Sequence, residues 1–111
     1  MTDPAASVIP ALLVLAAILL WWHSTVRALD RARDAARALC RRRGWQLLDQ
    51  TVSLRAVRPR RGDKGLCLER SYRFEFSADG ETRQPGGVLM AGGRILRVWA
   101  DGPEGRVIEE A

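Results

Sequence analysis

The sequence predicts an α+β protein in which a single N-terminal transmembrane helix continues into an arginine-rich helix, followed by a small antiparallel β-meander of four or five strands. Three observations lead to this class. Residues 5–22 carry no charge, residues 24–43 combine strong helix formers with an apolar residue every third or fourth position, and apolar and polar residues alternate after Gly44. We therefore expect four regions: a transmembrane anchor (1–23), a juxtamembrane arginine-rich helix (24–44), a sheet domain (45–100) and a flexible tail (101–111).

The uncharged segment is long enough to cross a bilayer. At a rise of about 1.5 Å per residue it covers about 27 Å, close to the hydrocarbon thickness of about 30 Å. A cleaved signal peptide is disfavoured, because no basic residue precedes the run and it ends in the bulky Trp21 and Trp22. Pro10 fits the first turn if Ser7 is the N-cap, or gives a tolerable kink if the helix begins near Pro4.

The end of the apolar run indicates a membrane interface and an orientation. Tryptophans concentrate at the membrane–water boundary, so we assign the interface to Trp21, Trp22, His23 and Arg27. Arginines follow the segment and none precedes it. The positive-inside rule then places the N-terminus outside and the C-terminal domain in the cytoplasm. Reduced thiols at Cys40 and Cys67 agree with that compartment.

Residues 24–44 predict one amphipathic helix. Its narrow apolar stripe comprises Leu29, Ala32, Ala36 and Leu39. Gly44 is a typical C′ residue, and the arginines of the last turn suit the negative end of the helix dipole. The alanine-rich stripe allows close approach, either to the protein's own sheet or to a second copy of the chain.

The arginines of this helix have two interpretations. They set topology and solvate a helix face, or they contact anionic lipid or a protein partner; the candidates for such contacts are Arg31, Arg41, Arg42 and Arg43. If the helix stands upright, Arg41 to Arg43 lie about 30 Å from Trp22, far beyond a Debye length of about 8 Å. Those three charges then reach lipid only if the helix lies along the surface.

The remaining segments predict the meander. Strands are expected at 52–56, 66–77, 82–91 and 94–100, with residues 45–48 as a short extra strand. Loops are expected at 59–65, at Ala78-Asp79-Gly80 and at Gly92-Gly93. Pro85-Gly86-Gly87 interrupts its strand and favours an edge position or a bulge.

One strand presents an aromatic row. Tyr72, Phe74 and Phe76 share one face with Leu66 and Leu68, and Arg70 interrupts that face, which indicates a nearby bulge or a head group that reaches an edge. Such a row resembles a base-stacking platform for RNA, but a small sheet needs these rings for its core. We expect a core, covered by the preceding helix.

The order of these features resembles a bacterial family of small membrane proteins catalogued as domain of unknown function number 3301, found mainly in gammaproteobacteria. The resemblance runs from about residue 8 to residue 99 and is strongest in YRFEFSADGE and GGVLMAGGRIL. It implies the bacterial inner membrane as the location. It carries no activity, cofactor or catalytic residue.

The residues disfavour an enzyme. His23 is the sole histidine and lies at the predicted interface, so no Cys–His or Ser–His–Asp set can converge, and we expect no metal or other cofactor. The expected function is a non-catalytic interaction or structural module at the cytoplasmic face of the inner membrane. Its partner would be a membrane protein or another copy of the chain. The alternative is an electrostatic binder of anionic lipid or RNA, with nucleic acid the less favoured of these ligands.

Overall fold

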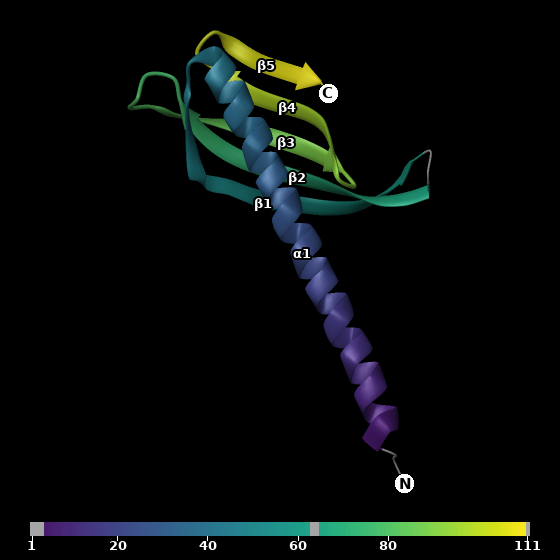
Figure 1. The fold of residues 1–111 in the computed structure, drawn as a ribbon. Coiled ribbons are helices and arrows are strands. Elements are labelled where there is room, and N and C mark those ends of the chain that lie inside the picture. Colours follow the sequence, from purple (N-terminus) through teal and green to yellow (C-terminus); the bar gives the residue numbers. More distant parts are fainter. Residues whose placement is uncertain (1–3, 63–64, 111) are drawn as a thin grey trace.

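A computed structural model describes residues 4–62 and 65–110. In this part of the chain one helix precedes five strands: α1 (Pro4–Arg43), β1 (Gln46–Gly62), β2 (Gly65–Ser77), β3 (Arg83–Ala91), β4 (Arg94–Gly102) and β5 (Gly105–Glu110). The strands form one sheet in the order β1-β2-β3-β4-β5, antiparallel throughout (Figure 1). The predicted α+β class is confirmed. The first residues of the expected anchor, the centre of the expected loop 59–65 and the last residue of the expected tail lie outside the described residues.

Helix α1 runs without a break through both predicted helical regions. It begins at Pro4, and a proline is tolerated there because a backbone N–H in the first turn would have no hydrogen-bond partner within the helix. Pro10 therefore lies inside the helix, rather than in a first turn after Ser7. Gly44, with φ +73°, ends it as predicted. The Trp45 N–H donates to the Cys40 carbonyl at 2.8 Å, which satisfies an acceptor of the last turn.

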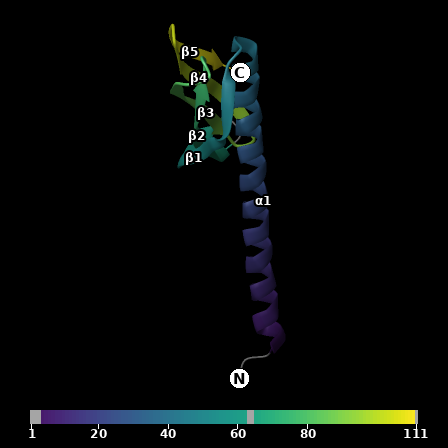
Figure 2. The ribbon, with the colours of Figure 1, turned by 90° about the vertical axis from the view of Figure 1, so that its left-hand side faces the viewer.

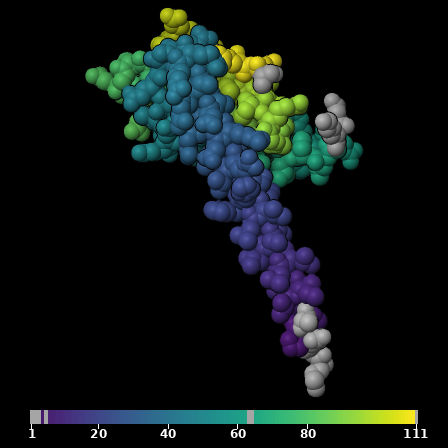
Figure 3. All heavy atoms as spheres, in the orientation of Figure 1, coloured from purple at the N-terminus to yellow at the C-terminus, as the bar shows by residue number. Residues whose placement is uncertain are grey.

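The two halves of α1 have different surroundings. The C-terminal half crosses one face of the sheet, whereas the N-terminal half extends beyond it (Figures 1 and 2). The space-filling view shows that the sheet does not cover this N-terminal half (Figure 3). Among the described residues, α1 is the one helix long and apolar enough to cross a membrane, and none of its most apolar window is buried in the protein.

The core lies between α1 and the sheet. Ala28, Ala32, Ala36 and Leu39 of α1 are buried against the sheet. The rings of Phe74 and Phe76 have no exposed surface, and Trp45 stacks on Phe76 with ring centroids 4.6 Å apart. The aromatic row is therefore core, and the stripe packs on the protein's own sheet, where alanines let the helix approach bulky rings closely.

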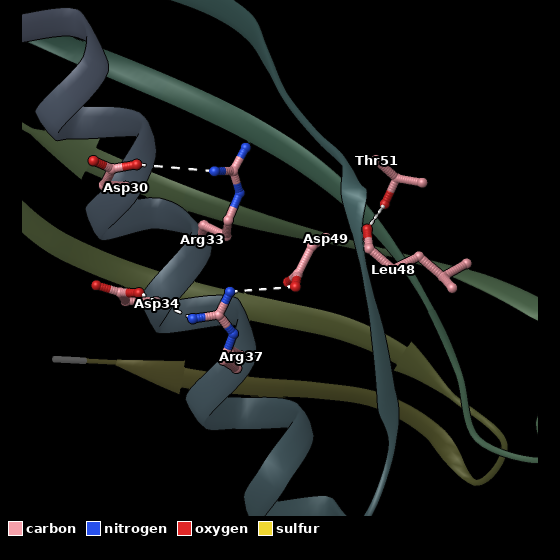
Figure 4. Close-up of polar contacts among 7 residues, drawn as sticks. All are labelled: Asp30, Arg33, Asp34, Arg37, Leu48, Asp49 and Thr51. Atoms are coloured by element: carbon pink, nitrogen blue, oxygen red, sulfur yellow. Dashed lines mark hydrogen bonds and ion pairs between the residues drawn. The ribbon is translucent and has the colours of Figure 1, made fainter.

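Strand β1 is much longer than predicted. It joins the expected short strands at 45–48 and 52–56 and extends through residues 59–62, which we had expected to be loop. Register shifts between Leu48 and Ser53 let it bend under α1. At the bend the Thr51 hydroxyl donates to the Leu48 carbonyl at 2.6 Å (Figure 4). The same hydroxyl accepts from the Glu75 N–H at 2.7 Å. This side chain replaces ladder hydrogen bonds lost at the bulge.

The Pro85-Gly86-Gly87 segment does not mark an edge, because β3 lies between β2 and β4. The glycines have a packing role instead. A Cβ at Gly86 would overlap the Phe74 ring on one face of the sheet, and a Cβ at Gly87 would overlap the Trp99 indole on the other. Pro85 is tolerated because its paired partner is Glu75 of β2, and pairing with β4 starts only at Gly86.

Residues 101–110 do not form the flexible tail that was predicted. Asp101 and Gly102 complete β4, and β5 pairs with β4 from Gly102↔Gly105 to Arg97↔Glu110. The polar composition was misleading because one side of the segment faces solvent. On the other side Val107 packs against the core cluster.

Candidate functional site

The candidate site lies where α1 leaves the sheet. The buried stripe of α1 runs through Ala36, Ala32 and Ala28, and Trp21 lies about two helical turns before Ala28 on the same face. Trp21 therefore lies on the sheet-facing side of α1, at the end of its apolar half. Both tryptophans are exposed, Trp21 to 52% and Trp22 to 63%.

Arg70 of β2 meets α1 at this point. Alternation along β2 puts its side chain on the core face, where it is only 5% exposed, and its guanidinium carbon lies 5.4 Å from the centre of the Trp21 ring. Within the described part of the chain no carboxylate forms an ion pair with it. A cation over an indole face is stabilised by the ring quadrupole, more strongly where water is excluded. Arg70, the charged residue that interrupts the apolar face of β2, therefore forms a contact between the helix and the sheet.

A pocket of about 550 Å³ opens beside this contact, between α1, β2 and the turn that joins β3 to β4. Its basic side chains are His23, Arg27, Arg31 and Arg70. The turn is fixed to the helix, because Arg31 donates from Nη1 to the Gly93 carbonyl at 2.5 Å. The structure therefore brings together four residues predicted for interface or lipid contact, namely Trp21, His23, Arg27 and Arg31, and adds Arg70 to them.

The pocket has an excess of positive charge. No aspartate or glutamate is among its described lining residues. The two nearest acidic residues in sequence have other partners: Asp30 faces Arg33 at 3.8 Å, and Glu69 faces Arg60 at 3.3 Å. The arginines of the pocket are therefore available to an anion from outside the protein.

The predicted contacts at Arg41, Arg42 and Arg43 lie elsewhere. They occupy the opposite end of α1, and Arg42 forms an ion pair with Glu109 of β5. Arg37, between the two ends, contacts Asp34 at 3.5 Å and Asp49 of β1 at 3.3 Å (Figure 4). The pairs with Glu109 and Asp49 link the helix to the sheet, whereas the pair with Asp34 lies within the helix.

A second basic hollow of about 480 Å³ lies around Trp99, Arg97 and Arg106 of β4 and β5. Two of its four lining arginines, Arg97 and Arg106, are paired within the protein, whereas Arg55 and Arg73 form no ion pair among the described residues. The Arg106 Nε is 2.6 Å from a carboxylate oxygen of Asp101, and its guanidinium covers the Trp99 ring at 4.5 Å. Arg97 lies 3.8 Å from Glu110. No residue of α1 lines this hollow, so it is the weaker candidate for a site at the end of the apolar segment.

The two thiols differ in environment. Cys40 is buried in the core, and burial together with the nearby Asp49 carboxylate raises its pKa to about 11. Cys67 is half-buried and lines the pocket beside Arg70. Among the described residues no group of three histidine, cysteine or carboxylate side chains is placed to hold a metal.

The fold and this site define a small α+β protein with one N-terminal helix able to span a membrane and a basic pocket at the base of that helix. The chain belongs to the family described as Protein of unknown function (DUF3301), whose family model matches residues 8–101. No curated protein and no solved structure matches the chain.

Proposed function

We propose that the protein is a non-catalytic module of the bacterial inner membrane. The N-terminal half of α1 spans the bilayer, and the C-terminal half holds the sheet against the cytoplasmic face. The observation that carries the proposal is the unbroken α1 helix, of which one half is uncharged and exposed and the other half is packed on the sheet. Exposed apolar side chains over that length are costly in water and favourable in lipid.

The cytoplasmic side is supported by the asymmetry of charge around the apolar segment. Arg27, Arg31 and Arg33 follow it within the first turns of the packed half, and no basic residue precedes it. A module with this geometry acts by holding its sheet, with the partner that the sheet binds, at a fixed distance from the membrane. A membrane protein or a second copy of the chain is the expected partner.

Two measurements test the anchoring and its direction. The full-length protein is expected to stay in the membrane pellet after extraction with alkaline carbonate. A fusion after Ala111 is expected to fluoresce when the reporter is a cytoplasmic fluorescent protein and to be inactive when it is a periplasmic phosphatase. Release by carbonate would exclude the anchor, and an active phosphatase fusion would reverse the orientation.

The partner is accessible to crosslinking in native membranes. We expect a discrete crosslinked species that survives raised salt, because a packed interface is screened far less than exposed charges are. Crosslinks that disappear entirely at moderate salt would favour the electrostatic alternative instead.

A further inference from the structure

We infer that the pocket between Trp21, Arg27 and Arg70 binds the phosphate headgroup of an anionic phospholipid. This inference rests on the proposed anchoring, because it takes the end of the apolar segment as the membrane boundary. It assigns a ligand to a defined site, rather than a general attraction to the arginines of the helix.

Depth along α1 is the first step. At about 1.5 Å per residue Arg27 lies about 7.5 Å beyond Trp22 along the helix axis, and Arg31 lies about 13.5 Å beyond it. The headgroup region of each leaflet is about 5–8 Å thick, the difference between the full bilayer and its hydrocarbon core. The mouth of the pocket is therefore at the level of lipid phosphates.

Charge is the second step. The pocket presents three arginines and a histidine without a lining carboxylate. Guanidinium groups offer paired N–H donors that match the oxygens of a phosphate. A zwitterionic lipid would bring an ammonium group next to these cations. Trp21 is the one aromatic ring among the described lining residues, and it already carries the Arg70 guanidinium on one face. Complementarity therefore favours an anionic headgroup.

Rigidity is the third step. Arg70 is held between the core and Trp21, and Arg31 is held by its bond to the β3–β4 turn. Side chains that are already ordered lose less conformational entropy when a ligand binds. Arg27 remains exposed, with no ion-pair partner among the described residues, so it is free to close on a bound headgroup.

The test is native mass spectrometry of the full-length protein in detergent, titrated with phosphatidylglycerol or phosphatidylcholine. The test variant is Arg27→Gln, because this exposed side chain supports no described contact in the fold. The matched control is Arg41→Gln, with the same charge change on the same helix about 21 Å further along. Circular dichroism checks that both variants keep the wild-type secondary structure.

We expect the wild type to prefer phosphatidylglycerol. Arg27→Gln should weaken that binding about fivefold, the equivalent of about 1 kcal/mol for one basic residue at an anionic surface. Arg41→Gln should bind like the wild type. The inference is overturned if there is no lipid preference, or if the two variants lose the same affinity.

A third arm separates lipid from a free anion. Inorganic phosphate in excess should not displace the bound lipid, because it lacks the acyl chains that lie against the apolar half of α1. Displacement at concentrations comparable to the lipid would make this a free-phosphate site and overturn the assignment. Carbonate extraction reports separately on anchoring, so a protein that stays in the membrane without a lipid preference contradicts this inference alone.

Discussion

The guanidinium of Arg70 lies over the Trp21 ring, with 5.4 Å between the guanidinium carbon and the ring centre. A buried residue of the sheet thereby contacts the last turns of the apolar half of α1. The contact fixes where the helix leaves the sheet and orders one wall of the basic pocket.

This pair should show an energetic coupling. In a double-mutant cycle with Trp21→Ala and Arg70→Met, we expect a coupling of about 1 kcal/mol, the magnitude of a partly desolvated cation–π contact. The measurement is thermal unfolding of the detergent-solubilised protein by circular dichroism. Trp22→Ala paired with Arg70→Met is the control, and its coupling should be near zero because the contact of Arg70 is with the Trp21 ring. Equal couplings in both cycles would contradict a specific contact.

The glycines of β3 should tolerate no side chain. Gly86→Ala places a methyl group into the buried Phe74 ring and close to the Trp99 carbonyl, so we expect a loss of about 1–3 kcal/mol in unfolding free energy. Gly87→Ala should cost less, because the Trp99 ring that it meets is partly exposed, whereas the Phe74 ring is fully buried.

Gly62→Ala is the matched control for both glycine variants, since a Cβ there is 3.8 Å from its nearest neighbour. Urea denaturation of the three variants gives the comparison. If Gly62→Ala proved as destabilising as Gly86→Ala, close ring packing would not be the cause.

The turn between β2 and β3 should make stability depend on acid pH. The Thr82 and Glu81 N–H groups donate to the Asp79 carboxylate and lower its pKa to about 2. A depressed folded-state pKa adds stability above the unfolded value near 4, and that stability is lost as the pH falls towards 2. Asp79→Asn should therefore be less stable than the wild type at neutral pH. The difference between the two should shrink when unfolding is repeated between pH 4 and pH 2, and a difference independent of pH would exclude the carboxylate as its source.

The cysteines should react at different rates. Cys40 is buried and its pKa is raised to about 11, so its thiolate is scarce at neutral pH. Cys67 is half-buried at the pocket, so a maleimide should label it first. Peptide mapping after a short exposure identifies the site, and labelling in urea provides the fully reactive reference. Rapid modification of Cys40 without denaturant would show that the core opens.

Local patterns predicted most of the fold. The uncharged run, the alanine stripe and the alternation in residues 66–77 each reflect burial on one side of a single element, which a sequence displays directly. The helix end at Gly44 was also predictable, because a positive φ is a local requirement that glycine meets. The strand at residues 105–110 was missed because it is a short edge strand with exposed polar residues, and it is held by pairing with β4 that no local pattern reveals.

The candidate site was predicted only in part. Trp21, His23, Arg27 and Arg31 follow from their position after an apolar segment. The role of Arg70 depends on how α1 crosses the sheet, a tertiary property, and the one available signal was a charge on an otherwise apolar strand face. The sequence also could not show that Glu109 pairs with Arg42, because the two residues lie 67 positions apart and meet only through the tertiary fold.

The unbroken helix has a mechanical consequence. Between Pro10 and Gly44 the chain contains no glycine or proline, so α1 has no hinge at the boundary between its apolar and packed halves. A helix that is long for its bilayer tilts as the bilayer thins. In the proposed anchoring the sheet is packed on the same straight helix, so its strands would rotate by the same angle relative to the membrane. Bilayer thickness would then set the orientation of the sheet.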